Sequence, residues 1–83
     1  MTVRFHPHAL ERMKERGASE DEVRSTVEQG ERFPAKFGRI GFRRNFRFGR
    51  EWRGRYYQNK QLEAYAMQEG SEWLVITVIT RYF

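Results

Sequence analysis

Two adjoining helix signals occupy residues 7–30, which read PHALERMKERGASEDEVRSTVEQG. Proline suits the first position of a helix, so we expect the first helix to begin at Pro7, with His6 at its N-cap, and to stop at Gly17. Apolar side chains recur along one side of this segment at helical spacing. The residues that we expect to pack inward are Ala9, Leu10 and Met13.

The second helix signal is a capping box. Ser19 is the predicted N-cap, Glu22 completes the Ser-x-x-Glu pattern three residues later, and Gly30 is the predicted end of the helix. Glu20 and Asp21 lie in the first turn, where the helix dipole favours negative charge. The expected buried residues of this helix are Val23, Thr26 and Val27.

After residue 30 the apolar pattern changes from helical to alternating, which indicates strands. Residues 62–67 and 73–81 flank a turn-forming segment at 68–71, so they predict a β-hairpin. An earlier extended segment alternates between two faces, with Phe42, Arg44, Phe46 and Phe48 on one and Arg43, Asn45 and Arg47 on the other. The sequence therefore predicts an α+β fold: a single domain over residues 1–83, with two N-terminal helices packed on a three- to four-stranded antiparallel sheet.

The composition excludes several classes of protein. The chain has 83 residues and no cysteine, so it carries neither a disulfide nor a thiolate metal site. Its longest apolar stretch, residues 73–79, is far too short to cross a bilayer, and its start lacks the apolar core of a secretory signal. We therefore expect a soluble, cytoplasmic protein that does not contact a membrane.

Positive charge is concentrated in residues 32–55, which hold nine Lys or Arg side chains and one acid, Glu51. Aromatic residues are interleaved with these cations, and this pattern is typical of surfaces that attract a polyanion and stack its bases. The alternative is that the aromatics belong to the core and the arginines only form the solvated side of the same strands. The predicted nucleic-acid-binding residues are Arg43, Arg44, Arg47, Arg53, Arg55 and Tyr57.

A second set of candidates lies on the first predicted helix. His8, Arg12 and Arg16 are four residues apart and therefore share one ridge of that helix. The dipole of the first turn favours a neutral imidazole at His8, as a general base requires, and two guanidiniums on the same ridge could hold a phosphate. A base and an anion clamp are a minimal set for cleaving RNA through its own 2′-hydroxyl without a metal. The alternative is that both arginines pair with acidic residues of the helices.

Thr80 is the fourth candidate catalytic residue, because it precedes Arg81 and Tyr82 at the end of the last predicted strand. The alternative is that Thr80 is a β-branched residue that only fills this strand. No metal site and no cofactor are predicted. The two histidines, His6 and His8, have no third ligand nearby in the sequence, and the chain lacks a glycine-rich phosphate loop.

The N-terminal segment resembles a small bacterial domain family of unknown function. The resemblance lies in residues 5–17, which fit the pattern H-A-x-x-R-M-x-x-R-G, and in the capped SEDEV segment at residues 19–23. That family looks related to the RelE- and BrnT-like toxins of the barnase–EndoU–colicin–RelE group, whose members are metal-independent ribonucleases. The polar members of the matching motif are His8, Arg12 and Arg16, so the resemblance implies a ribonuclease with these residues at its site.

Three functions remain open on the sequence. The first is a metal-independent endoribonuclease of toxin type that acts on RNA phosphodiester bonds. The second is a non-enzymatic module that holds RNA or DNA with the same basic, aromatic strands. The third is an interaction domain whose cationic face binds an acidic protein partner, such as an antitoxin. The ribonuclease hypothesis requires the first helix and the arginine-rich strands to present their cations on one shared surface.

Overall fold

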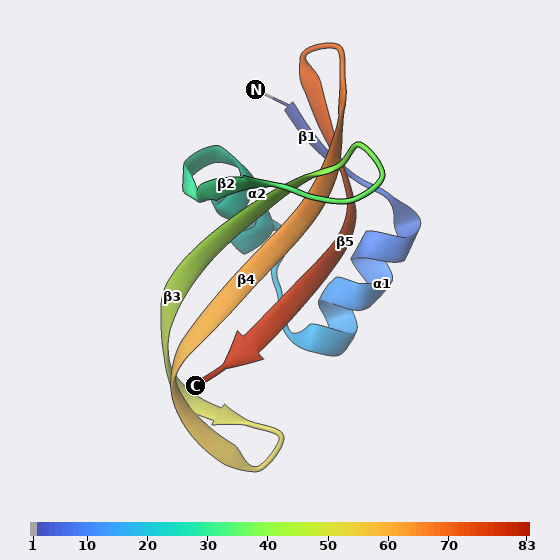
Figure 1. Ribbon diagram of the computed structural model, residues 1–83. Helices are drawn as coiled ribbons and strands as arrows, with labels where there is room; N and C mark the ends of the chain where they lie inside the picture. The colour runs from blue at the N-terminus through green and yellow to red at the C-terminus, as the bar shows by residue number, and fades with distance from the viewer. Residues whose placement is uncertain (1) are drawn as a thin grey trace.

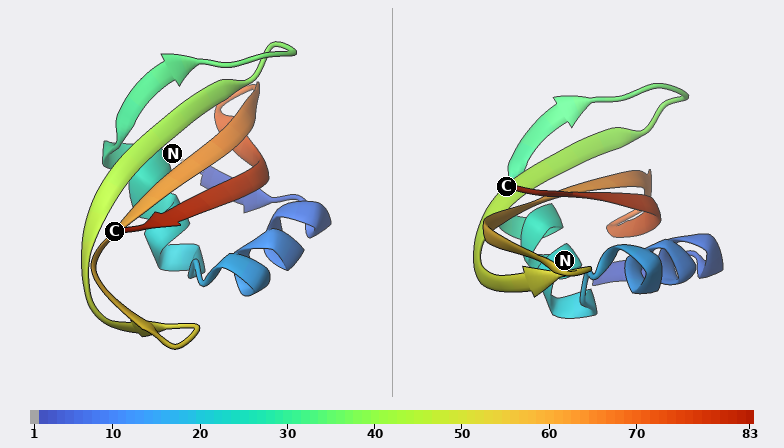
Figure 2. Two further views of the ribbon diagram at one scale, coloured as in Figure 1. Left: turned by 60° about the horizontal axis from the view of Figure 1, so that its bottom comes forward. Right: turned by 90° about the horizontal axis from the view of Figure 1, so that it is seen from below.

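Two helices cover one face of a five-stranded sheet in the computed structural model, which describes residues 2–83 (Figure 1). The loop between β2 and β3 projects from the opposite side of the sheet (Figure 2). The elements are β1 (Thr2–Phe5), α1 (Pro7–Arg16), α2 (Glu20–Gln29), β2 (Glu31–Pro34), β3 (Ile40–Trp52), β4 (Arg55–Glu69) and β5 (Glu72–Tyr82). The strand order is β1-β5-β4-β3-β2. Within residues 2–83 no helix is long and apolar enough to cross a membrane.

The sheet differs from the prediction in strand number and direction. We predicted three or four antiparallel strands, but residues 2–83 form five, because β1 and β2 add a strand at each edge. β1 pairs parallel with β5, so the sheet is mixed. Both added strands are only four residues long, and Pro34 is tolerated in β2 because an edge strand can lack one N–H donor. Strands this short are defined by their partners more than by their own alternation.

Both predicted helices begin and end where their caps indicated. In α1 the His6 side chain accepts a hydrogen bond from the backbone N–H of His8 at 3.0 Å. Gly17 ends this helix in the left-handed region, at φ 73°. In α2 Ser19 and Glu22 form the reciprocal capping box. The local signals in residues 7–30 therefore specified both helices.

The core lies between the helices and the sheet. The helix residues that are buried there are Ala9, Met13, Val23, Thr26 and Val27, all of which were predicted to face inward. The prediction for Leu10 is wrong, because its side chain is 37% exposed. α1 packs mainly against β5, near one edge of the sheet. Only a narrow arc of this helix therefore meets the sheet, and Leu10 lies outside that arc.

The strands β3, β4 and β5 present alternate residues to the two faces of the sheet. The face beneath the helices, called the helix face, includes Phe42, Arg44, Phe46, Lys60, Leu62, Ala64, Val78 and Thr80. The other face, called the open face, includes Arg43, Asn45, Arg47, Gln61, Glu63, Tyr65, Ile79 and Arg81. The predicted alternation of residues 42–47 and the hairpin between β4 and β5 are confirmed.

Candidate nucleic-acid interface

The ridge predicted on α1 extends along the whole helix. His8 is exposed near the N-terminal end and lies about 12 Å from Arg16 along the helix axis, at 1.5 Å per residue. Arg12 Nη1 donates to Glu15 Oε2 at 2.8 Å, whereas Arg16 Nη1 donates to the backbone oxygen of Val78 at 2.6 Å. The three side chains therefore do not converge on one point.

Arg16 instead meets Arg53 and Thr80 at a pocket between the end of α1 and the sheet. This pocket has a volume of about 280 Å³ and is lined by Glu15, Arg16, Trp52, Arg53, Thr80 and Tyr82. Thr80 Oγ1 and Tyr82 Oη both donate to the backbone oxygen of Arg16, at 2.9 and 2.7 Å. Arg53 Nη2 donates to the backbone oxygen of Glu15 at 2.6 Å. These contacts satisfy carbonyl groups in the last turn of α1 and hold the helix to the sheet.

The other predicted binding residues lie on different surfaces. Arg44 is on the helix face, where its guanidinium is bonded to a serine hydroxyl of α2. Arg55 lies over the ring of Tyr57 at 5.8 Å, next to the turn of the β3–β4 hairpin. Arg43 and Arg47 are on the open face. The basic segment therefore supplies cations to both faces of the sheet, and Arg43 and Arg47 are the predicted residues that share the open one.

A charged cluster lies at the centre of the open face. Glu63 projects from the central strand β4, and its side chain is only 4% exposed although the helices are on the other face. Its Oε2 accepts a hydrogen bond from Arg43 Nε at 2.8 Å and forms an ion pair with Arg81 Nη1 at 2.9 Å. Its Oε1 accepts from Tyr65 Oη at 2.8 Å. Three neighbouring strands thus hold one carboxylate between two guanidiniums and a phenol.

Glu63, Arg43, Tyr65 and Arg81 form a group called the Glu63 cluster, in which Glu63 is ionised and Tyr65 is neutral at neutral pH. Burial alone would raise the pKa of Glu63, but hydrogen bonds from Arg43, Tyr65 and Arg81 outweigh burial and lower this pKa. Burial and the hydrogen bond to Glu63 raise the pKa of Tyr65, so the phenol stays protonated. The side chains of Arg43 and Arg81 are 35% and 55% exposed. Both guanidiniums therefore retain N–H donors for a ligand in solvent.

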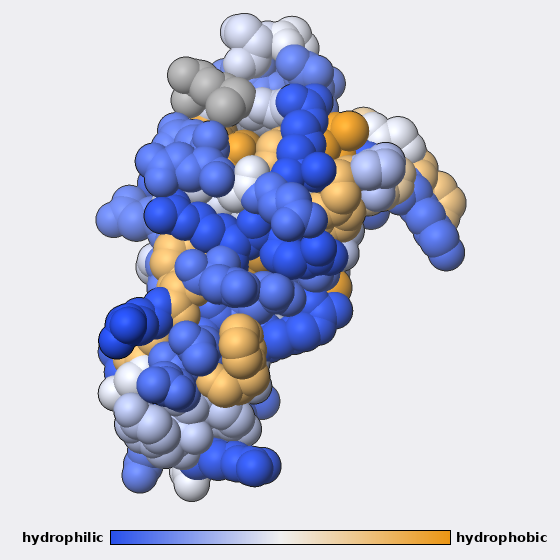
Figure 3. Space-filling model, turned by 60° about the vertical axis from the view of Figure 1, so that its left-hand side comes forward, coloured by the Kyte–Doolittle hydropathy of each residue, from blue (hydrophilic) through white to orange (hydrophobic). Residues whose placement is uncertain are grey.

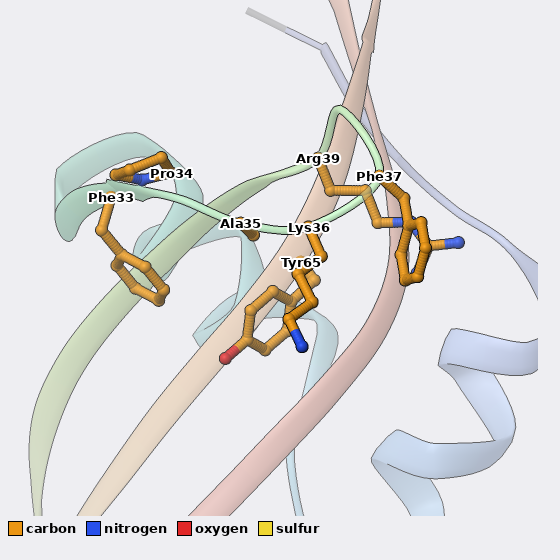
Figure 4. A pocket seen from close by; sticks show the side chains of 7 residues that line it. All are labelled: Phe33, Pro34, Ala35, Lys36, Phe37, Arg39 and Tyr65. Carbon is orange, nitrogen blue, oxygen red and sulfur yellow. The ribbon is translucent and has the colours of Figure 1, made fainter.

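A second pocket adjoins the Glu63 cluster and shares Tyr65 with it. Its volume is about 370 Å³, and its lining residues are Phe33, Pro34, Ala35, Lys36, Phe37, Arg39 and Tyr65. Figure 4 shows that most of these side chains come from the β2–β3 connection, while Tyr65 projects from β4 below it. The rings of Phe33 and Tyr65 meet edge to face at 6.0 Å. Aromatic rings and cations are thus combined beside the buried carboxylate.

The surface chemistry suits an anionic, ring-bearing ligand. Hydrophilic residues cover most of the side of the molecule shown in Figure 3, and apolar residues appear there in small separate patches. Guanidiniums bind phosphate bidentately, and aromatic faces stack on bases. Residues 2–83 contain no group of three or more His, Cys, Asp or Glu that could hold a metal ion. The open face therefore combines exposed guanidiniums with aromatic rings.

Sequence reasoning missed four residues of this site: Phe33, Glu63, Tyr65 and Arg81. One signal was present in the sequence. Glu63 lies between Leu62 and Ala64, so the sequence puts a carboxylate in the middle of a predicted strand. Charges in such positions are rarely left without a partner. A search for the cation opposite Glu63 would have pointed to this face.

The fold and the open face define a small α+β domain with a cationic sheet surface. A family model described as a domain of unknown function, DUF4258, matches residues 5–80, and the chain belongs to this family. The expected resemblance to an uncharacterised domain family is therefore confirmed. No curated protein and no solved structure matches the chain.

Proposed function

We propose that this chain is a metal-independent endoribonuclease that binds RNA on the open face of its sheet. The Glu63 cluster carries the proposal, because two guanidiniums and a phenol lie within hydrogen-bond distance of one carboxylate. The α1 sequence resembles a domain family that looks related to RelE- and BrnT-like toxins, and this relation favours the same reaction class. The proposed base is Glu63 in place of His8, which lies on the helix side of the molecule.

In the proposed reaction Glu63 accepts the proton of an RNA 2′-hydroxyl, and the 2′ oxygen forms a bond to the adjacent phosphorus. Arg43 and Arg81 bind the non-bridging oxygens and stabilise the charge that develops on them. The bond from phosphorus to the 5′ oxygen breaks, and this oxygen takes the proton of Tyr65. Glu63 then returns its proton to Tyr65 along their hydrogen bond. The products are a 2′,3′-cyclic phosphate and a 5′-hydroxyl.

RNA binding would itself prepare the base. Arg43, Tyr65 and Arg81 lower the pKa of Glu63 against the effect of burial, and the two arginines are also the groups that a phosphate engages. When they turn toward the phosphate, Glu63 loses hydrogen bonds and gains a negative neighbour, and both changes raise its pKa. The same movement frees Glu63 Oε2, which both guanidiniums contact in the free protein.

The second candidate function is RNA binding without cleavage. It is favoured by the full set of hydrogen bonds around Glu63, which is also what a structural ion network provides. In that case Glu63 only orients Arg43 and Arg81 and accepts no proton. An acidic protein partner, such as an antitoxin, would use the same cations and compete with RNA for them.

Digestion of total RNA at low salt with a chelator separates these functions. We expect wild type and His8→Ala to leave cyclic-phosphate ends, and Glu63→Gln to be slower by about 100-fold or more. Intact RNA that stays bound to every variant would favour the binding function. Cleavage that is lost in His8→Ala and kept in Glu63→Gln would show that the catalytic residue is His8 on α1 and not Glu63. Circular dichroism checks that both variants are folded.

A further inference from the structure

The pocket beneath the β2–β3 connection has a feature that the proposed reaction does not use. Within residues 2–83, Arg39 Nε is the buried side-chain nitrogen that has no hydrogen-bond partner. A buried donor without an acceptor is unfavourable, and native proteins rarely contain one. Arg39 lines the pocket, so a bound molecule toward which its side chain turned would supply the missing acceptor.

The polar side chains of this pocket offer donors and almost no acceptor. Lys36 and Arg39 carry only N–H groups, and the hydroxyl hydrogen of Tyr65 is engaged by Glu63. Phe33, Tyr65 and Phe37 add flat apolar surface, and Phe37 is 85% exposed on the loop (Figure 4). The complementary ligand is a planar ring whose edge carries carbonyl oxygens and no amino group toward these donors.

We propose that this pocket binds a keto-bearing nucleobase, guanine or uracil, of an RNA strand on the open face. This site rests on the proposed function, because that function places the strand there. The Arg39 side chain turns toward the bound ring so that the keto oxygen accepts from its guanidinium, and the ring stacks on the aromatic side chains. The ring enters with the edge that carries O6 of guanine or O4 of uracil. On that edge adenine and cytosine carry an amino group, which would meet Lys36 and Arg39 donor to donor. Since Tyr65 joins the pocket to Glu63, the bound base selects which phosphodiester reaches the cluster.

Binding of 2′-O-methyl hexanucleotides tests the pocket separately from the reaction, because these strands lack the attacking hydroxyl. Fluorescence anisotropy gives the Kd of hexamers of uridine, of alternating guanosine and uridine, of adenosine and of cytidine. We expect the first two to bind about tenfold more tightly than the last two. Arg39→Met should remove this preference, and the matched control Arg24→Met, on α2, should keep it.

Equal affinity of wild type for all four hexamers, or a preference that survives in Arg39→Met, would overturn the base pocket. A base preference without any cleavage of total RNA would overturn the reaction and leave the pocket standing. Cleavage of total RNA without base preference would overturn the pocket and leave the reaction standing. If wild type bound none of the hexamers, both the pocket and the RNA surface would be wrong.

Discussion

Arg16 Nη1 donates a hydrogen bond to the backbone oxygen of Val78 at 2.6 Å and so joins the last turn of α1 to β5. β1 pairs with β5 only through residues 72–75, and Val78 lies beyond this paired segment. Arg16 was predicted to hold a phosphate. It instead donates to β5 at a point where β1 no longer pairs with that strand. The same residue accepts hydrogen bonds from Thr80 and Tyr82 through its backbone oxygen.

Arg16→Met should lower the free energy of unfolding by about 1.5–3 kcal/mol, because it removes a hydrogen bond from a charged donor to a partly buried carbonyl. Arg12→Met is the matched control on the same helix. Its pair with Glu15 is largely exposed, so the expected loss is below about 1 kcal/mol. Urea denaturation followed by circular dichroism measures both. Equal losses would show that the contact with Val78 adds nothing to stability.

Gly17→Ala should be more destabilising than Gly54→Ala by at least about 1 kcal/mol, because overpacking adds to backbone strain only at Gly17. Both glycines have positive φ, at 73° and 80°. A Cβ at Gly17 would lie 2.5 Å from Tyr82 Oη, whereas nothing lies within 4 Å of one at Gly54. Thermal unfolding compares the two variants. A Gly54→Ala variant as unstable as Gly17→Ala would contradict the close packing at the end of α1.

Glu22→Gln should destabilise the protein by about 1–3 kcal/mol, because a buried ammonium loses its counter-charge. Lys60 Nζ donates to Glu22 Oε1 at 2.8 Å, and the Lys60 side chain is 1% exposed. Lys60→Met should cost less, since the carboxylate that it leaves is 26% exposed. Urea denaturation at pH 7 measures both losses of stability. A larger loss in Lys60→Met than in Glu22→Gln would contradict the claim that the unpaired buried ammonium is the more costly of the two.

The same pair predicts the acid sensitivity of the fold. Burial alone would raise the pKa of Glu22, but the hydrogen bonds from Lys60 and Ser19 lower it below the ordinary 4.5. The stabilisation is therefore complete above about pH 4.5 and is lost as the pH falls through the lower pKa of the folded state. Glu22→Gln should show a shallower loss of stability over this range than wild type. Identical slopes would mean that Glu22 does not contribute.

Arg47→Gln should weaken the salt dependence of RNA binding. Each phosphate contact to a single strand contributes about 0.7 to the slope of log affinity against log salt, so the slope should fall by about this amount. Arg47 is exposed on the open face, whereas the control Arg12→Gln lies on α1 and should leave the slope unchanged. Titrations with the 2′-O-methyl uridine hexamer measure it. A slope that falls in Arg12→Gln and stays unchanged in Arg47→Gln would place the RNA against the helices.

The helices could be predicted because their signals are local. The cap at Ser19 and the stop at Gly17 act within a few residues of the helix ends they define. β1 could not be predicted in the same way, because Thr2–Phe5 becomes a strand only through its pairing with residues 72–75. Leu10 was misplaced because the sequence period does not reveal how much of a helix the sheet covers.

The site was predicted less well than the helices. Its residues are far apart in the sequence and become neighbours only through the register in which the strands pair. Arg43 and Glu63 are 20 residues apart in sequence and become partners across β3 and β4. The alternation of residues 42–47 put Arg43 and Arg44 on opposite faces, but the sequence could not show which of these faces the helices cover. Arg43 and Arg44 are neighbours in the chain, and one bonds Glu63 on the open face while the other bonds α2 on the helix face.

The most direct test of the RNA surface is an NMR titration of the ¹⁵N-labelled protein with the 2′-O-methyl uridine hexamer. We predict that the largest amide and side-chain shift changes occur at Arg43, Glu63, Tyr65 and Arg81, with those of His8 and Arg12 unchanged. Changes concentrated on α1, with the open face silent, would contradict the account.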